Sequence, residues 1–193
     1  FEQDTLISIC GGDLIPTVNG IPIENWKPIL IKSGSVLRFD SCQKGCRAYL
    51  AAAGGFKIPE IMDSKSTYLR AGIGGYQGRA LKKGDRLPIE ALGELSSKIM
   101  ASLHESDSIE DYMKANWRIN GESFYQSERY IRIMKSRQFH LFTTKSQSSL
   151  YKELFTVTTD SDRMGYRLRG PNLALRHHRE MISEAVSFGT IQV

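Results

Sequence analysis

Seven consecutive residues, Ser161–Arg167, bring together two guanidiniums, a carboxylate, a phenol and a hydroxyl around one glycine. Arg163 and Arg167 are four residues apart, and each presents a planar fork of donors that can clamp a carboxylate or a phosphate. Tyr166 adds a hydrogen-bond donor on a rigid ring. We interpret the run as an anion-binding loop. The alternative is a structural turn, in which Arg163 pairs with Asp162 and Tyr166 fills a half-buried strand position.

A second stretch, residues 64–81, places four glycines within seven residues, between Arg70 and Arg79. The backbone N–H groups of such a loop can form a nest for an anion. The spacing is not that of a P-loop or of a dinucleotide-binding turn. The sequence leaves two interpretations open: a binding loop that uses Arg70, Arg79, Gly74 and Gly75, or glycines that only permit tight turns between strands.

The remaining reactive side chains predict no further site. His177 and His178 are adjacent, and adjacent residues of a strand point to opposite faces, so a solvated loop is favoured over a metal site. Cys42 and Cys46 form a C-x3-C pair without a second pair or a nearby histidine. We expect these two and Cys10 to be buried small side chains. An odd number of cysteines favours a reducing compartment, the cytoplasm.

Composition limits the class of protein. The chain has 193 residues, 24% of them charged, and a net charge of +5. No apolar run approaches the roughly 18 residues of a membrane span, so we expect no membrane partner. The positive charge is not interleaved with a recognisable nucleic-acid motif, so we expect no nucleic acid either. Because the first residue is Phe1 and not Met, we expect a fragment of a longer protein.

Strand signals dominate the first ninety residues. Apolar runs between turn residues predict strands over 6–10, 28–32, 35–39 and 47–53. We expect the first strand to end in a turn at Gly11. The second and third should form a hairpin across Ser33 and Gly34, and the fourth should be buried.

The second half of the chain is less regular. We expect a short helix within 93–115 and another over 147–154, and we expect strands over 131–134, 154–159 and 191–193. The pattern favours two β-rich units, 1–92 and 130–193, joined by a connecting segment over 93–129. The predicted class is mainly β, of barrel or sandwich type, with few short helices.

Five segments carry a resemblance to a known family; in order they are residues 10–14, 45–55, 64–81, 161–171 and 182–193. With them the chain resembles the family of the 5-oxoprolinase C subunit. This family is also called the biotin-dependent carboxyltransferase or allophanate hydrolase subunit 2 family, and it includes KipA-like proteins. The arginine-glycine loop and the Ser-Asp-Arg-Met-Gly-Tyr run are its most specific segments. The match is weakest over residues 93–150.

The resemblance implies a fold of two cyclophilin-like β-barrel units. Residues 1–92 would be the C-terminal part of the first unit and residues 130–193 the N-terminal part of the second. It also implies a cytoplasmic hydrolase complex, in which this chain, a KipI-like B subunit and an A subunit use ATP to open 5-oxo-L-proline to L-glutamate. The ATP site is not located by the resemblance.

Two other functions remain open. The first is that of a KipA-like regulator that binds and antagonises a kinase-inhibitor partner, with Trp117, Phe124 and Tyr125 as candidate contacts. The second is that of the carboxyltransferase component of a urea carboxylase-like enzyme, which is the one interpretation that involves biotin.

Roles for individual residues follow from the enzyme interpretation. We expect Arg163, Tyr166 and Asp162 to be catalytic, with Arg163 and Tyr166 orienting a substrate carboxylate or carbonyl. Backbone donors and arginines suit this task because negative charge builds on oxygen when an amide-like carbonyl is attacked. No metal is expected. The expected substrate-binding residues are Arg70, Arg79, Gly74, Gly75, Ser161 and Arg167.

Overall fold

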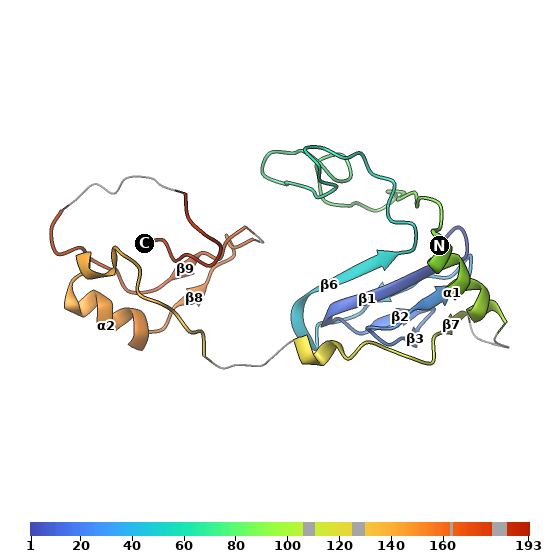
Figure 1. Ribbon diagram of the computed structural model, residues 1–193, viewed down its shortest axis with the longest axis horizontal. Helices are drawn as coiled ribbons and strands as arrows, with labels where there is room; N and C mark the ends of the chain where they lie inside the picture. Colours follow the sequence, from blue (N-terminus) through green and yellow to red (C-terminus); the bar gives the residue numbers. More distant parts are fainter. Residues whose placement is uncertain (106–110, 125–129, 163, 179–184) are drawn as a thin grey trace. The chain divides into compact units, whose positions relative to one another are not determined.

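The computed structural model describes residues 1–105, 111–124, 130–162, 164–178 and 185–193. The chain forms two compact units, residues 1–127 and 128–193 (Figure 1). The described residues are mainly β, as the sequence predicts, with two α-helices and two short 3-10 helices. No helix among them is long and apolar enough to cross a membrane.

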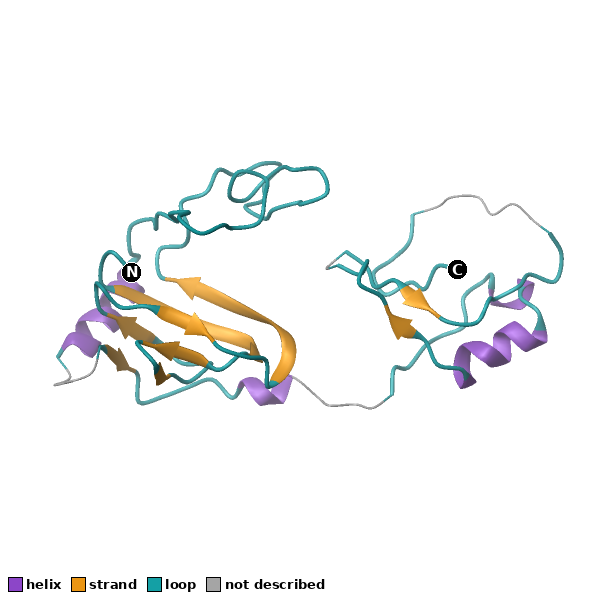
Figure 2. Ribbon diagram, turned by 180° about the vertical axis from the view of Figure 1, so that it is seen from behind, coloured by secondary structure: helices purple, strands orange, loops and turns teal. Residues whose placement is uncertain are grey.

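The first unit contains a four-stranded antiparallel sheet with the strand order β6-β1-β4-β7 (Figure 2). Its strands are β1 (Thr5–Asp13), β4 (Ile29–Ile31), β6 (Lys44–Ala52) and β7 (Tyr112–Lys114). A smaller sheet has the order β3-β2-β5. Its strands are β2 (Pro16–Val18), β3 (Ile21–Pro22) and β5 (Leu37–Phe39). Helix α1 (Glu94–His104) follows later in the chain.

Alternating side chains of the larger sheet supply two apolar cores, because successive residues of a strand point to opposite faces. Leu6 pairs with Leu30, and Leu30 pairs with Met113 on the next strand. This row packs with Leu103 of α1. On the opposite face, the neighbouring isoleucines of β1 and β4 pack with Val18 of the smaller sheet. The larger sheet is therefore covered by α1 on one face and by the smaller sheet on the other.

The predicted hairpin across Ser33 and Gly34 is wrong, although both of its strands exist. Strand β4 pairs with β1 and β7, whereas β5 pairs with β2 in the other sheet. The turn between them carries the chain from one sheet to the other. Local sequence shows where such strands begin and end, but their partners depend on contacts distant in sequence.

Two further expectations about the first unit are corrected. Strand β1 does not end at Gly11 but continues to Asp13, with a register shift opposite β6. A Cβ at Gly11 would lie 2.5 Å from the carbonyl oxygen of Arg47, so glycine lets the two strands approach closely. Strand β6 lies at the edge of the sheet, and most of its residues are exposed. It is therefore not the buried strand that its apolar run predicted.

The second unit contains helix α2 (Thr144–Lys152) and a two-stranded pair, β8 (Thr156–Val157) and β9 (Leu168–Arg169). The 3-10 helices are η1 (Gly121–Phe124) in the first unit and η2 (Phe139–Leu141) in the second. Helix α2 starts where the Thr143 hydroxyl accepts a hydrogen bond from the N–H of Ser146, which satisfies one free donor of the first turn.

The second unit departs from expectation in three places. The strands predicted over 131–134 and 191–193 are absent from the described residues, which have no regular secondary structure there. The strand expected over 154–159 is confirmed only at its centre, as β8. Helix α2 begins at Thr144, three residues before the predicted start at 147, because the Thr143 side chain caps its first turn.

Candidate functional site

Residues 55–90 form one long excursion from the end of β6, here called the 55–90 lobe (Figure 1). Its two ends are joined by a bridge between Phe56 and Ile89 and by a hydrogen bond from the N–H of Glu90 to the Gly55 carbonyl, 2.9 Å. The Lys65 ammonium also lies 2.8 Å from a Glu90 carboxylate oxygen, and their hydrogen bond lowers the pKa of Glu90. Long loops with joined ends and no regular secondary structure are frequently functional.

Arg79 is held inside the lobe by a bidentate ion pair with Asp85. Its Nη1 lies 2.7 Å from Asp85 Oδ2, and its Nη2 lies 2.8 Å from Asp85 Oδ1. The same two nitrogens donate to the Ala80 carbonyl and to Gln77 Oε1, both at 2.9 Å. The guanidinium also lies 5.2 Å from the centre of the Tyr76 ring. Four of the five arginine N–H donors are thus used within the lobe.

Sequence reasoning singled out Arg79 but missed its partner, Asp85. The Asp85 carboxylate also accepts a hydrogen bond from the Lys82 N–H at 2.6 Å. The Arg79 guanidinium first, and then this N–H, lower the pKa of Asp85 from about 3.8 to about 2. The dipeptide Gly84-Asp85 could have indicated this partner, since it predicts a turn close to Arg79 in the sequence. An Asp in a turn readily accepts hydrogen bonds from local N–H groups.

The glycines of residues 72–78 are needed for the shape of the loop. Gly74, Gly75 and Gly78 are buried and have positive φ angles. A Cβ at Gly78 would collide with the carbonyl of Gly72, and one at Gly74 would collide with the carbonyl of Ser66. These positions therefore require both the conformational freedom and the small size of glycine.

Several N–H groups of the loop are bonded within it. The N–H of Gly78 donates to the Gly74 carbonyl at 2.9 Å, and that of Arg79 donates to the Tyr76 carbonyl at 3.3 Å. Tyr68 and Ile73 exchange two backbone hydrogen bonds. These donors stabilise the loop, which supports the structural interpretation for this part of it. Arg70, the other predicted arginine, lies exposed on the same lobe.

The second candidate segment, residues 161–167, lies in the connection between β8 and β9. Ser161 closes this connection: its Oγ accepts a hydrogen bond from the Arg167 N–H at 2.8 Å. Asp162 Oδ1 accepts from the N–H groups of Met164 and Gly165, at 2.8 and 3.2 Å. The side chains of Ser161 and Asp162 thus shape the turn in which the predicted residues lie.

The exposed side of this turn carries a phenol. Tyr166 is 63% exposed, so it is not the half-buried strand filler of the alternative interpretation. Arg167 is exposed as well. Arg163 lies outside the described residues, so the predicted pairing of Arg163 with Asp162 stays a prediction. The two candidate segments belong to different compact units.

The cysteines are not buried as expected. Cys42 and Cys46 are exposed, because strand β6 and the turn before it lie at the sheet edge, and Cys10 of the inner strand β1 is partly exposed. His177 and His178 are exposed, as expected for a solvated loop. In the described part of the chain, no three His, Cys, Asp or Glu side chains gather in a way that could hold a metal ion.

The aromatic side chains named for a regulatory contact are only partly described. Trp117 is 50% exposed, so part of its ring faces solvent. Tyr125 lies outside the described residues.

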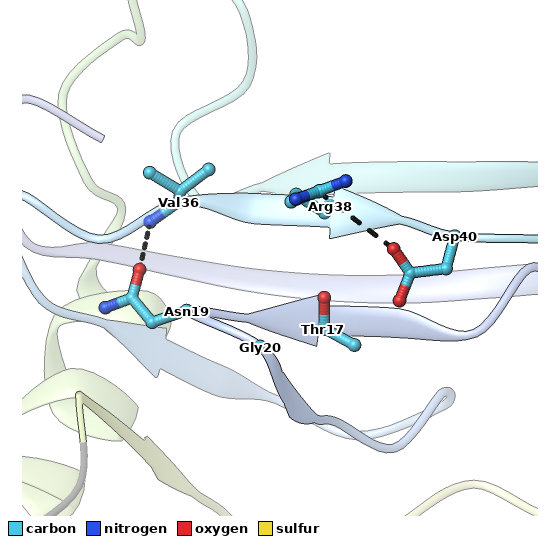
Figure 3. A pocket seen from close by; sticks show the side chains of 6 residues that line it. All are labelled: Thr17, Asn19, Gly20, Val36, Arg38 and Asp40. Atoms are coloured by element: carbon cyan, nitrogen blue, oxygen red, sulfur yellow. Dashed lines mark hydrogen bonds and ion pairs between the residues drawn. The ribbon is translucent and has the colours of Figure 1, made fainter.

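A hollow of about 470 Å³ lies on the smaller sheet (Figure 3). Asn19 Oδ1 accepts a hydrogen bond from the Val36 N–H at 2.9 Å, and Asn19 Nδ2 donates to Asp111 at 2.8 Å. Arg38 lies 4.0 Å from Asp40. These polar groups mainly bond one another, and none of the predicted site residues lines the hollow.

The family model for the carboxyltransferase domain, subdomains A and B, matches residues 1–193. The chain is 31% identical over all 193 residues to the C subunit of 5-oxoprolinase from Haemophilus influenzae, of which it covers 56%. It is 33% identical over 171 residues to urea amidolyase of Lachancea kluyveri, covering 89% of this chain and 9% of that protein. The chain thus spans about half the length of the 5-oxoprolinase C subunit that it matches.

A solved structure has the same fold. The crystal structure of Kluyveromyces lactis urea carboxylase matches with a TM-score of 0.69 and 28% identity, over 92% of this chain and 15% of that one. The comparisons therefore point to one family, and its members include parts of two different enzymes.

Proposed function

The chain belongs to the carboxyltransferase-domain family, subdomains A and B, and from this membership we propose that it is one subunit of an ATP-dependent 5-oxoprolinase. The complex would open 5-oxo-L-proline to L-glutamate. The observation that carries the proposal is the 31% identity to the C subunit of 5-oxoprolinase over the whole chain. The similarity to urea amidolyase covers 89% of the chain and only 9% of that protein.

The chemistry of lactam opening suits the groups of the 161–167 turn. Attack on the lactam carbonyl builds negative charge on its oxygen, and the substrate also carries a carboxylate. Hydrogen-bond donors and guanidiniums aimed at these oxygens stabilise such charge. We assign this role to Arg163 and Tyr166, with Arg167 as a further substrate contact. The exposure of Tyr166 supports the assignment, because most of this residue is accessible to a ligand.

Ser161 and Asp162 have a different role in this proposal. Their side-chain oxygens accept backbone N–H groups within the turn, at 2.8 Å from Arg167 and 2.8 Å from Met164. They would therefore position the turn and Arg163, which follows them in the sequence. A turn whose shape is set before substrate arrives loses less entropy on binding.

Within the first unit, we assign further anion contacts to the 55–90 lobe. Arg70 is its best placed candidate for an anionic group, because it is exposed. Arg79 would act mainly through Asp85, by holding the loop that contains Gly74 and Gly75. We assign ATP to the complex and not to this loop, since the N–H groups of Gly78 and Arg79 are bonded inside it.

A second function is favoured by the fold comparison. With a TM-score of 0.69 to a urea carboxylase, the chain would be a carboxyltransferase component that acts on a urea-like nitrogen. Biotin would then carry the carboxyl group. Both functions require a site that binds an amide-like group and stabilises negative charge on oxygen. They differ in the substrate, which is 5-oxo-L-proline in the first function and a urea-like compound in the second.

The proposal is tested by reconstitution with the complete protein. The purified A and B subunits are incubated with ATP and 5-oxo-L-proline, with and without this protein, and glutamate is measured. Glutamate formation that requires this protein supports the proposal. Turnover that is unchanged without it, together with binding to the KipI-like B subunit, would instead favour the KipA-like regulatory role. Carboxyl transfer from carboxybiotin to urea, without glutamate formation, would favour the second function.

Arg163 gives a sharper test of the site. Arg163→Ala should abolish turnover while the variant still assembles with its partners. Arg137→Ala is the matched control, because it removes an exposed arginine from the same unit outside residues 161–167. Full activity of Arg163→Ala would refute the assignment of the turn.

A further inference from the structure

Two cysteines lie at the start of strand β6, and the function proposed above uses neither of them. Cys42 lies in the turn before the strand, Cys46 lies within the strand, and both are exposed. Exposure is the first requirement for a thiol that reacts with a dissolved partner, because a buried thiol is inert. The second requirement for a reactive pair is that the two side chains lie close enough to react with each other.

Strand β6 bends at this point. Its register with β1 shifts there: two steps along β1, from Gly11 to Asp13, face four steps along β6. The extra residues of β6 include Gly45, whose φ angle is 80°. Left-handed glycines are common in bulges, and a bulge bends its strand and redirects side chains. Cys46 therefore follows a bend and not a straight, fully extended strand.

The bend brings Cys42 against the backbone next to Cys46. The Cys42 thiol donates a hydrogen bond to the Gly45 carbonyl oxygen, with the sulfur and the oxygen 2.9 Å apart. One peptide bond joins that carbonyl to Cys46. Standard bond lengths then place the Cα atoms of the two cysteines at most about 8.5 Å apart, against roughly 13 Å for four extended steps. Since a disulfide joins Cα atoms up to about 6.8 Å apart, closure requires at most a small movement of an exposed turn.

The third cysteine has a different environment. Cys10 lies on β1, an inner strand of the sheet, and its partner across the strands is Tyr49 of β6. It is only partly exposed. Cys10 therefore serves as an internal reference, because it is a thiol of the same chain that faces an aromatic residue across the sheet and not another cysteine.

We propose that Cys42 and Cys46 form a thiol–disulfide exchange site, which a small-molecule disulfide such as oxidised glutathione converts to an intrachain disulfide. In the first step, one cysteine thiolate attacks a sulfur of the small disulfide, and one glutathione thiolate leaves. In the second step, the other cysteine attacks the protein sulfur of this mixed disulfide, the protein disulfide forms, and the second glutathione leaves. The two glutathione thiolates take up the two cysteine protons, and the two electrons lost by the protein reduce the small disulfide to two thiols.

Such a disulfide is a reversible modification. Exposed disulfides are more easily reduced than buried structural ones, and disulfides of reducing compartments are usually transient. The bridge over residues 42–46 therefore forms while the oxidised small molecule is in excess, and it opens when thiols are restored. While closed, it fixes the turn to the first residues of the edge strand β6. None of this depends on the proposed function, because the reaction is observed on the protein alone.

Lys44 lies between the two cysteines and makes the test direct. The complete protein is reduced, incubated with oxidised glutathione, quenched with acid, alkylated in denaturant and digested with trypsin. Trypsin cleaves after Lys44 and on both sides of the pair, so the two cysteines fall on separate peptides, residues 39–44 and 45–47. An intrachain disulfide joins these peptides into one species, which mass spectrometry detects and which dithiothreitol splits.

The joined peptides should become the main form of both cysteines in excess oxidised glutathione, while Cys10 stays alkylated. Their yield should be the same at high and low protein concentration, because an intrachain reaction does not depend on it. Separately alkylated peptides at every glutathione ratio would overturn the proposal. So would a stable glutathione adduct on either peptide, or a yield that falls on dilution.

Cys46→Ser and Cys10→Ser are matched variants. Cys46→Ser keeps the thiol at Cys42 but removes the one that resolves the mixed disulfide, so the glutathione adduct should persist at least about tenfold longer than in wild type. Cys10→Ser should form the joined peptides as wild type does. Because Cys46 is exposed, its replacement should leave Tm within about 2 °C of wild type, and Cys42→Ser provides the reciprocal measurement. Equal adduct lifetimes in Cys46→Ser, Cys42→Ser and wild type would refute the paired role of the two thiols.

Discussion

Asp85 holds the guanidinium of Arg79 through both carboxylate oxygens, at 2.7 and 2.8 Å. This ion pair joins the glycine-rich loop of residues 72–78 to the turn at residues 82–85, where the Lys82 N–H donates to the same carboxylate. The Arg79 side chain is 30% exposed and that of Asp85 only 13%. A bidentate, partly buried pair of this geometry restricts both segments more than a typical surface ion pair does.

The pair predicts a pH dependence of the lobe. The pKa of Asp85 is lowered to about 2, below its ordinary value of 3.8. Because the pKa is lower in the folded state, the stabilisation is complete above about pH 4 and is lost as the pH falls towards 2. We expect NMR titration of the Asp85 carboxyl to show this low pKa. Amide protection of residues 72–85 should decrease over the same interval.

Asp85→Asn should loosen the lobe at neutral pH, because the neutral amide no longer pairs with Arg79. Trypsin should then cleave after Arg79, Lys82 or Lys83 several-fold faster than in the wild type. Lys65→Gln is the comparison, since the Lys65–Glu90 pair is nearly half exposed and should matter much less. Equal cleavage of wild type and Asp85→Asn would contradict the role of the pair.

Substitution of two glycines of the loop distinguishes the energetic cost of backbone strain from that of a steric collision. Gly72 and Gly78 both have a φ angle of 66°, but a Cβ at Gly72 meets nothing within 4 Å, whereas one at Gly78 meets the backbone of Gly72 and Ile73. Gly72→Ala should cost about 1 kcal/mol of unfolding free energy, for the left-handed conformation alone. Gly78→Ala should cost about 3 kcal/mol. Urea unfolding of both variants measures the difference, and equal costs would rule out the collision.

The sequence predicted much of the first unit, because its strands are short apolar runs separated by turn residues. Runs 6–10 and 28–32 both contain the buried side chains that form the cores. The pairing of β4 and β5 was not predictable, since hydrogen-bond partners distant in sequence decide it. The exposure of β6 was not predictable either, because an apolar run does not show whether its strand lies at the edge or in the centre of a sheet.

The candidate site was predictable in its residue types but not in its internal pairing. The spacing of Arg79 and Gly78 indicated a loop with chemistry, yet nothing in the pattern assigned four arginine donors to Asp85, Gln77 and Ala80. The hydroxyl of Ser161 and the carboxylate of Asp162 likewise bind backbone N–H groups of their own turn. Such local hydrogen bonds compete with a role in binding, and only geometry decides between them.

Asp162 allows its two possible roles to be separated. Asp162→Asn keeps an oxygen that can accept the N–H groups of Met164 and Gly165, whereas Asp162→Ala removes it. If Asp162 positions the turn, the Asn variant should keep glutamate formation within a few-fold of wild type, and the Ala variant should lose at least about tenfold. The values of kcat and KM of the reconstituted complex measure this. An equal loss in both variants would show that the negative charge itself is required.

Substitution of one leucine in each unit by alanine tests how much each side chain contributes to stability. Leu30 is fully buried between Leu6 and Met113, whereas Leu154, just after α2, is 91% exposed. Leu30→Ala should lower the free energy of unfolding by about 3 kcal/mol, because it leaves a cavity in the core next to α1. Leu154→Ala removes the same atoms from the surface and should change it by less than about 0.5 kcal/mol.

Chemical unfolding of the complete protein, followed by fluorescence and circular dichroism, measures both variants. The same side chain is deleted in each case, so the difference reports burial alone. A small effect of Leu30→Ala would contradict the core of the first unit. A cost for Leu154→Ala close to that of Leu30→Ala would show that this leucine is covered in the complete protein. The second unit would then derive its stability from apolar contacts with a neighbouring segment, since none of its described apolar side chains is fully buried.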